Sequence, residues 1–321
     1  MGVNLRDVIP HEELTFEELK GRVIGIDALN SLYQFLASIR QPDGTPLMDS
    51  KGNITSHLSG LFYRTGRLIE LGIKPVYVFD GKPPELKKKE LERRKELKED
   101  ALGKWKKAKE AGDLDEALKH AKRTSRFTDE MLEDSKKLLE HMGIPQIQAP
   151  SEAEAQCAHM CRKGDIWAVG SQDYDSLLFG SPTLVKGLTL SGKLELSIVH
   201  LKKVLEKMGV TREQLVDIAI LIGTDFDEGV KGIGPKKALQ MVKTGFSKNA
   251  TGIEFEKIEG IFLKPDVTEK YELQWKPPDK EKLLAFLSGE HNFSEDRVEK
   301  VSNNLLSAHK EFSQRGINEW F

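Results

Sequence analysis

The segment 167–179, WAVGSQDYDSLLF, carries two aspartates two residues apart, directly after an apolar run. The apolar residues at its start predict a short buried strand, and Asp173 and Asp175 follow where that strand ends. Ligands bind beyond the strand ends of open α/β sheets, and two carboxylates at this spacing can hold a hard cation through oxygen. Aspartate is also a common turn residue, and this segment taken alone favours a turn.

Other acidic residues stand at equivalent positions along the chain. Apolar runs at 23–26, 75–79 and 220–222 lead into Asp27, Asp80 and Asp225, and a predicted helix start at 149–154 carries Glu152 and Glu154. Ser151 with Glu154 fits a capping box, and Glu152 favours the helix dipole. Clustered carboxylates repel one another unless a cation neutralises them. Their joint occurrence predicts a site for two divalent ions about 3.5–4 Å apart, of the kind that cleaves phosphodiesters.

At these residues the chain resembles the flap endonucleases, structure-specific 5′ nucleases of DNA replication and repair. The matching stretches, in the family's order, are MGV, IGIDALNSLYQFL, GNITSHLSGLFYRT, KPVYVFDGKPPELKKKEL, APSEAEAQ, SQDYDSLLFG, LIGTDFDEGVKGIGPKKA and QRGINEWF. Together they span nearly the whole chain. The resemblance implies cleavage of 5′ flaps at the junction of single-stranded and duplex DNA, including the processing of Okazaki fragments, and a 5′ exonuclease activity.

The resemblance also implies how the metal site is built. Two Mg²⁺ ions, for which Mn²⁺ can substitute, would generate hydroxide and stabilise the leaving oxygen. The implied ligands, direct or through water, are Asp27, Asp80, Glu152, Glu154, Asp173, Asp175 and Asp225.

Composition sets wider limits on function. The chain has 321 residues, of which 31% are charged, and a net charge of −2, so composition alone does not indicate a nucleic-acid-binding protein. It shows no secretory signal and no apolar run long enough to span a bilayer. Cys157 and Cys161 lie on one predicted helix, and two ligands make a poor zinc site. We therefore expect two buried, reduced thiols.

The expected fold is α/β, with a mostly parallel central sheet and helices on both faces, and the resemblance implies a PIN-like 5′-nuclease core. We expect one nuclease domain over residues 1–305 and a C-terminal tail over 306–321. Helices are predicted at 28–39, 56–71, 128–142, 197–208, 211–222, 280–287 and 294–308, with a hairpin at 183–196 that turns at Ser191-Gly192 and an irregular segment at 249–278.

Segment 82–126 is almost entirely charged and favours helix. It contains 16 basic and 10 acidic residues and so carries +6 in a chain of −2. Its apolar residues are too sparse for a packed helix pair, which predicts a mobile helical insertion that stands off the core. Lys87 and Arg94 share one helix face, and a solvated charged face is the alternative. By resemblance, residues 82–127 form a helical arch whose Lys87 and Arg94 offset charge on the scissile phosphate.

The segment 229–238, GVKGIGPKKA, combines a glycine hairpin with a helix start. Gly232 and Gly234 let backbone N–H groups approach a phosphate, Pro235 suits the first helical turn, and Lys236 adds positive charge. Such a helix N-terminus binds the duplex backbone without reading its sequence. The resemblance implies a helix–hairpin–helix element at about residues 215–245 that also binds K⁺ through backbone carbonyls.

Four further DNA contacts are implied by the resemblance, and each has an ordinary alternative. Gly2 lies near the DNA in the family, although a flexible terminus explains this glycine equally well. Tyr33 would stack on a base near the branch point, whereas an aromatic residue at that place in a helix is usually core. Arg64 and Arg67 would contact phosphates, whereas the polar side of an amphipathic helix is usually solvated.

The last eight residues are QRGINEWF. Gln314, Ile317, Trp320 and Phe321 match the peptide that docks on sliding clamps of the PCNA type, with apolar side chains on one side of a helical turn. The aromatic pair could instead fold back on the protein's own core. The expected partners are branched DNA with a 5′ flap and the sliding clamp, without a membrane. We expect a monomer in the cytoplasm of an archaeal cell, or in the nucleus of a eukaryotic one.

Two other functions fit parts of the sequence. An Asp-x-Asp phosphatase would use Asp173-Tyr174-Asp175 after a strand, and it predicts a covalent aspartyl intermediate. A non-catalytic junction-binding scaffold predicts binding without cleavage. The seven carboxylates disfavour the scaffold, and the glycine hairpin together with the clamp peptide disfavours the phosphatase.

Overall fold

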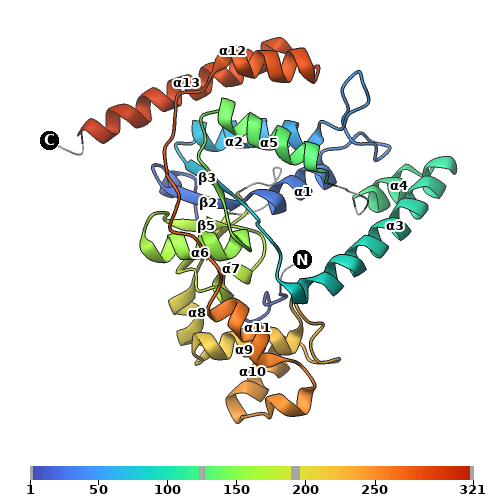
Figure 1. Ribbon diagram of the computed structural model, residues 1–321, viewed down its shortest axis with the longest axis vertical. Coiled ribbons are helices and arrows are strands. Elements are labelled where there is room, and N and C mark those ends of the chain that lie inside the picture. Colours follow the sequence, from blue (N-terminus) through green and yellow to red (C-terminus); the bar gives the residue numbers. More distant parts are fainter. Residues whose placement is uncertain (1–2, 123, 125–126, 189–195, 319–321) are drawn as a thin grey trace.

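Seven strands form one mixed sheet in the order β1-β7-β6-β5-β2-β3-β4 (Figure 1). The computed structural model describes residues 3–122, 124, 127–188 and 196–318, with side chains as far as residue 312. The strands are β1 Glu12–Glu13, β2 Val23–Asp27, β3 Lys74–Phe79, β4 Gln146–Gln148, β5 Ala168–Gly170, β6 Thr183–Lys186 and β7 Ser197–His200. Strands β2 to β6 pair in parallel, whereas β7 is antiparallel to β6 and β1. The predicted α/β fold with a mostly parallel sheet is confirmed.

Helices cover both faces of this sheet. One side carries α1 Ala28–Ser38, α2 Ser56–Glu70, α5 Asp129–His141, α12 Lys280–Leu283 and α13 Glu295–Asn318, and the other carries α6 Ala153–Lys163 and α7 Asp175–Leu178 (Figure 1). The period-2 alternation of β3 explains how one strand serves both layers. Tyr77 and Phe79 join the core under α1 and α2, whereas Val76 and Val78 pack with Cys157 of α6. Both predicted free thiols, Cys157 and Cys161, are buried.

A second group of helices extends the α6 side of the molecule. It consists of α8 Leu201–Met208, α9 Arg212–Ile222, α10 Pro235–Thr244 and α11 Phe255–Leu263, at the bottom of Figure 1. These helices share a core with α7 and with the N-terminal segment, which contributes Val3, Leu5 and Ile9. In the part of the chain that the structure describes, no helix is long and apolar enough to cross a membrane.

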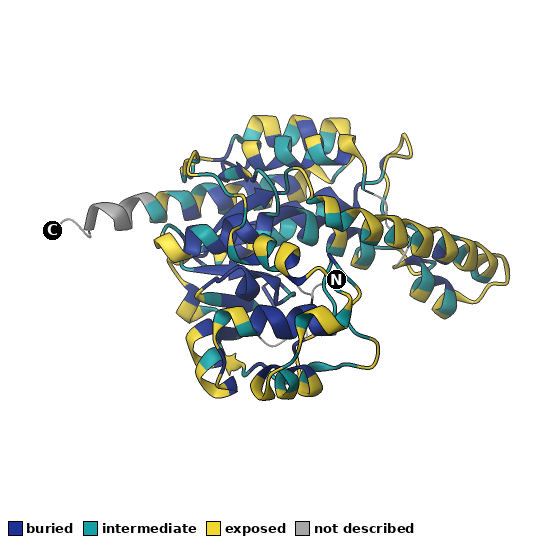
Figure 2. Ribbon diagram, turned by 60° about the horizontal axis from the view of Figure 1, so that its bottom comes forward, coloured by how far each residue is buried: buried dark blue, intermediate teal, exposed yellow. Residues whose placement is uncertain are grey.

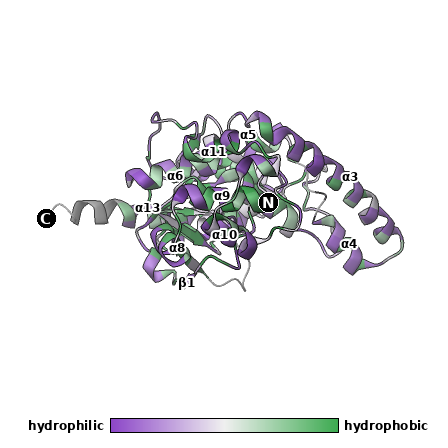
Figure 3. Cartoon of the chain, turned by 90° about the horizontal axis from the view of Figure 1, so that it is seen from below, coloured by the Kyte–Doolittle hydropathy of each residue, from purple (hydrophilic) through white to green (hydrophobic). Residues whose placement is uncertain are grey.

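Among its described residues, the charged insertion begins with the short 3₁₀ helix η2 Glu85–Lys87. It continues as two longer helices, α3 Lys88–Glu110 and α4 Leu114–Ala121, that project from the body of the protein (Figures 1 and 3). It stands off the core as predicted, and Figure 2 shows that most of it is exposed. The expectation that it could not pack as a pair is wrong, because α3 and α4 lie against each other with Ala101, Ala117 and Ala121 buried. Alanine lets two helices approach closely without large apolar side chains, so a count of large hydrophobic residues missed the contact.

Three element boundaries differ from the sequence predictions. The segment 197–200 is strand β7 rather than the start of a helix, because its β-branched pair Ile198-Val199 extends the antiparallel ladder with β6. The predicted hairpin at 183–196 is confirmed only in its first strand, β6, because the antiparallel partner β7 lies beyond the predicted end. The predicted turn at Ser191-Gly192 lies outside the described residues. Helix α11 lies inside the segment predicted to be irregular, and it buries Phe255, Ile258 and Phe262. Helix α13 continues past the predicted end at 308 to Asn318.

A buried acid links α9, α11 and the turn between α10 and α11. Asp217 of α9 forms an ion pair with Lys248 at 2.8 Å, and Lys248 also contacts Glu259 of α11. Lys248 Nζ and Asp217 Oδ1 form this ion pair without the angles of a hydrogen bond, and Asp217 Oδ1 has no hydrogen-bond partner among the described atoms. Burial, together with the neighbouring Glu259 carboxylate, raises the pKa of Asp217 to about 7.

This raised pKa predicts a pH-dependent stability. Between about pH 4 and pH 7 the native protein holds a proton on Asp217 that the unfolded chain has released, so the stability contribution of Asp217 falls as the pH rises through that window. The substitution Asp217→Asn is therefore expected to stabilise the protein more at pH 8 than at pH 5. Urea unfolding at the two pH values measures the difference. The same substitution at the exposed Asp266 is the control, and an equal effect of Asp217→Asn at both pH values would contradict the prediction.

Candidate active site

Seven carboxylates gather at the edge of the sheet where the parallel strands end. Asp27 ends β2, Asp80 follows β3, Asp173 and Asp175 follow β5, Glu152 and Glu154 open α6 after β4, and Asp225 lies between α9 and α10. Because β5, β2 and β3 are adjacent and parallel, their ends deliver these side chains to the same place. The sequence-predicted acids are thus brought together from five separate parts of the chain.

Burial and mutual repulsion raise the pKa of several of these carboxylates. Burial raises the pKa of Asp27 well above its usual value, with a further contribution from Asp80. Burial also raises the pKa of Glu154 well above its usual value, with further contributions from Asp175 and Asp173. The pKa of Asp175 is raised to about 7 by burial and Asp173, against the opposing effect of a hydrogen bond from the Val3 N–H. Burial and neighbouring acids both disfavour the charged form of these carboxylates, whereas a bound cation favours it.

Neutral hydrogen bonds also fix the carboxylates. The Val3 N–H donates to Asp175 Oδ1 at 2.9 Å, and the Ala153 N–H donates to Asp80 Oδ1 at 2.7 Å. The second bond lets Asp80 satisfy a free N–H at the start of α6. This bond from Ala153 to Asp80 requires the backbone after β3 to lie close to the backbone before α6. The two backbones meet where the Gly81 N–H donates to the Ser151 carbonyl at 2.6 Å.

The capping box predicted for Ser151 and Glu154 is wrong. Helix α6 begins at Ala153 with Glu152 as its N-cap residue. The Glu154 carboxylate accepts a hydrogen bond from Ser171 Oγ at 2.9 Å instead. The local pattern suited a cap, but the tertiary fold turns Glu154 inward and places Asp80 at the helix start.

Two cations of the insertion reach into the acidic cluster. The Lys87 ammonium contacts the Glu152 carboxylate and lies 3.8 Å from Asp225 Oδ2, and Arg94 Nη2 donates to Asp225 Oδ1 at 2.5 Å. Arg94 also pairs with Glu90 at 2.7 Å. Lys87 and Arg94 thus act as internal counter-ions for two of the seven acids.

The donor chemistry of the cluster suits hard divalent cations. Mg²⁺ and Mn²⁺ prefer carboxylate oxygen, and all seven acids offer it. As they stand, no three acidic, histidine or cysteine side chains within the described residues are close enough together to hold an ion. Lys87 and Arg94 meanwhile occupy oxygens of Glu152 and Asp225.

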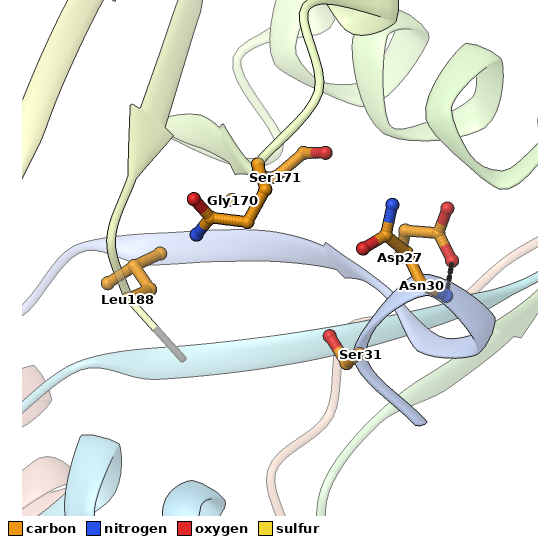
Figure 4. A pocket seen from close by; sticks show the side chains of 7 residues that line it. Asp27, Asn30, Ser31, Gly170, Ser171 and Leu188 are labelled. Atoms are coloured by element: carbon orange, nitrogen blue, oxygen red, sulfur yellow. Dashed lines mark hydrogen bonds between the residues drawn. The ribbon is translucent and has the colours of Figure 1, made fainter. Parts of the chain in front are cut away.

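A small hollow lies beside Asp27 (Figure 4). The residues that line it are Asp27, Asn30, Ser31, Gly170, Ser171, Gln172 and Leu188. Sequence reasoning missed Asn30 and Ser171, which both contact the acids. Asn30 follows the strand-end aspartate by three residues, where an N-cap aspartate accepts a backbone N–H, and this spacing could have drawn attention to it.

The structure describes three of the four further residues that the resemblance implied as DNA contacts. Tyr33 is 37% exposed, and the Lys98 ammonium lies 4.6 Å from its ring centroid. Arg67 is exposed and pairs with Glu70 at 3.2 Å, whereas Arg64 is half-buried on the same helix. Gly2 lies outside the described residues.

The glycine hairpin precedes α10 as predicted. Gly232 has φ 81° and an open surrounding, Gly234 is the N-cap residue, and Pro235 occupies the first turn. Lys236 is exposed next to the helix start. The start of α10 therefore lies beside an exposed positive charge, an arrangement that suits phosphate.

The peptide predicted to dock on a sliding clamp is described only in part. Gln314 and Ile317 belong to the last turns of α13, where the structure describes the backbone and not the side chains. Trp320 and Phe321 lie outside the described residues.

Comparison with known proteins identifies relatives along the whole chain. The XPG N-terminal domain matches residues 1–101 and the XPG I-region matches residues 143–225. Flap endonuclease 1 of Staphylothermus marinus is 52% identical over 349 residues, which cover both proteins completely. Flap endonuclease 1 of Pyrococcus horikoshii is 52% identical over 338 residues, with coverage of 100% of this chain and 98% of the relative.

Solved structures agree with the sequence comparison. Flap endonuclease-1 from Methanococcus jannaschii superposes with a TM-score of 0.81 at 47% identity, over 96% of this chain and 98% of that one. The catalytic core of Rad2 in complex with a DNA substrate has a TM-score of 0.74 at 23% identity and supports the fold alone. The archaeal relatives and the acidic cluster at the sheet edge lead to one conclusion: the chain belongs to the flap endonuclease family of structure-specific, metal-dependent nucleases, which cleave 5′ flaps from DNA.

Proposed function

We propose that the seven carboxylates hold two Mg²⁺ ions, with Mn²⁺ as a substitute, for the hydrolysis of one phosphodiester where a 5′ single strand leaves duplex DNA. The observation that carries the proposal is the convergence of acids from five parts of the chain on one sheet edge, opposed by Lys87 and Arg94. A fold tolerates so many repelling charges when cations complete the site. The ligands are Asp27, Asp80, Glu152, Glu154, Asp173, Asp175 and Asp225.

The carboxylates and the two cations of the insertion would have different roles in the reaction. When bound, a pair of divalent ions supplies Lewis-acid stabilisation to the attacking and leaving oxygens of an in-line displacement. The seven carboxylates would hold and orient those ions through their oxygens. Lys87 and Arg94 exchange their acidic partners for the scissile phosphate and offset the charge that builds on it.

The surrounding surface would hold the DNA by its backbone and by stacking. Tyr33 offers an aromatic face for a base at the branch point, and Arg64 and Arg67 offer cations to phosphates. The second duplex site combines Gly232, Gly234 and Lys236 at the start of α10, in the helix–hairpin–helix element at about 215–245, where backbone carbonyls would bind K⁺. Gly2 would lie near the DNA at the active site.

Further proposals concern organisation and partners. The chain would form one nuclease domain at residues 1–305, with the arch at 82–127, and a C-terminal tail at 306–321 that carries the clamp-binding peptide. Gln314, Ile317, Trp320 and Phe321 would dock on a sliding clamp, and the nuclease would act as a monomer. The relatives at 52% identity come from archaea, which favours a cytoplasmic location.

The deciding experiment uses an end-labelled double-flap DNA with Mg²⁺. The wild type is expected to cut at the junction, and Asp173→Ala is expected to abolish cutting while binding of the same DNA survives, because the substitution removes a metal ligand and no DNA contact. Replacing the exposed Asp266 with alanine is the control and should leave cleavage unchanged. Tight junction binding without cleavage by the wild type would leave a scaffold function. Release of phosphate from small esters without junction preference would indicate a phosphatase.

A further inference from the structure

We propose that Asn30 is a positioning residue of the metal site, whose side-chain amide fixes the carboxylate of Asp173 relative to that of Asp27. The inference rests on the proposed metal-dependent function. It concerns a residue that carries no charge and would not itself touch DNA or metal.

The contacts of Asn30 join two acids that are far apart in the sequence. Its backbone N–H donates to Asp27 Oδ1 at 2.8 Å, which closes the first turn of α1 (Figure 4). Its side-chain Nδ2 donates to Asp173 Oδ2 at 3.0 Å. Almost any residue could supply the first bond, but only a side chain with a donor can supply the second. Asn30 thereby ties the end of β2 to the loop that follows β5.

A second neutral group continues this connection. Ser171 Oγ accepts from the Asp173 N–H at 3.1 Å and donates to Glu154 Oε1 at 2.9 Å. The hydrogen bonds therefore run from Asp27 through Asn30, Asp173 and Ser171 to Glu154. They fix three carboxylates from three separate elements, and Asn30 and Ser171 line the same hollow beside Asp27.

The neutrality of these donors matters for a cation site. Lys87 and Arg94 also bond carboxylates, but a positive side chain repels an arriving cation and competes for the same oxygens. An amide or hydroxyl donor uses one lone pair of a carboxylate, leaves its charge in place, and leaves its other lone pairs available. Asn30 and Ser171 can therefore remain bonded when metal binds, as outer partners of metal ligands usually do.

The test replaces the donor without a large change of size. Metal-free Asn30→Leu protein is titrated with Mn²⁺ in the absence of DNA, and free Mn²⁺ is followed by electron paramagnetic resonance. We expect binding that is weaker by about tenfold or more, the usual effect of losing an outer partner of a metal ligand. Ser38→Ala is the matched control, since Ser38 lies on the same helix and its hydroxyl bonds the Gln34 carbonyl. It should bind Mn²⁺ as the wild type does.

A double substitution separates positioning from general damage to the fold. In an Asp173→Ala background, Asn30→Leu is expected to weaken Mn²⁺ binding no further, because the acid it orients is gone. A purely structural role would add its effect in both backgrounds. If Asn30→Leu fails to fold, Ser171→Ala removes the next connection and carries the same expectation of weaker Mn²⁺ binding.

The results distinguish a failure of the positioning role from a failure of the proposed function. If the wild type cleaves the flap and binds Mn²⁺, and Asn30→Leu binds Mn²⁺ equally well, the positioning role is overturned while the proposed function stands. If the wild type neither binds Mn²⁺ nor cleaves, the proposed function fails and the positioning role fails with it. Additive losses in the Asp173→Ala background would likewise overturn it.

Discussion

Replacing Lys87 with alanine is expected to slow flap cleavage by about 10²–10³-fold, the usual effect of losing one group that stabilises transition-state charge. The same substitution is expected to tighten metal binding. Its ammonium contacts Glu152 and lies 3.8 Å from Asp225, so it repels an arriving cation and occupies the oxygens that the cation needs. Single-turnover cleavage at saturating Mg²⁺ measures the first effect, and Mn²⁺ titration without DNA measures the second.

A slower cleavage together with tighter Mn²⁺ binding distinguishes the predicted role of Lys87 from general damage to the site, which would weaken both. Lys88→Ala is the control, because Lys88 is the next residue and is exposed, and both quantities should stay at the wild-type value. Weaker Mn²⁺ binding by Lys87→Ala would show that Lys87 supports the acids rather than competing for them. An unchanged cleavage rate would remove Lys87 from the reaction altogether.

The substitution Gly81→Ala is expected to impair both stability and cleavage. A Cβ at Gly81 would lie 2.3 Å from the carbonyl oxygens of Ala149 and Pro150, which are backbone atoms and cannot turn aside. Overpacking of this kind costs about 1–3 kcal/mol of folding free energy. Separating the two backbones would also move Asp80 away from the start of α6, and a displacement of about 1 Å in an active site can slow a reaction about 10²-fold. Urea unfolding and flap cleavage at saturating Mg²⁺ measure the two effects.

Gly260→Ala provides the comparison. Gly260 lies inside α11, where a Cβ meets nothing within 4 Å, so alanine should stabilise the helix by about 0.5–1 kcal/mol and leave cleavage unchanged. Stability of Gly81→Ala equal to that of the wild type would mean that the loop before α6 can yield, and the close approach would then not determine the position of Asp80.

The strand-end acids could be predicted because each depends on a local pattern. An apolar run that stops at an aspartate is visible in the sequence, and parallel strands must end at one edge of their sheet. The prediction of a capping box was wrong because a residue distant in sequence takes its place. Ser151 and Glu154 satisfied the local rule, but the start of α6 is taken by Asp80, whose distance in sequence no local rule includes.

Contacts between distant residues were the part that the sequence did not reveal. The bond from Asn30 to Asp173 spans 143 positions, and it exists because β2 and β5 are neighbours, which no residue spacing shows. The pairing of α3 with α4 was missed because it depends on alanines, whose small size matters only once a partner helix is in place. Arg94 was expected to face a phosphate, and its bond to Asp225 depends on how the insertion lies over the sheet edge.

The spread of the seven acids along the chain has a consequence for protein synthesis. The first, Asp27, leaves the ribosome early, but the last, Asp225, is made only after more than two thirds of the 321 residues. Chains are made from the N-terminus, so every nascent chain that ends before Asp225 lacks at least one acid of the proposed metal site. The proposed metal site can therefore be complete only late in synthesis, after the segment that carries Asp225 has been made.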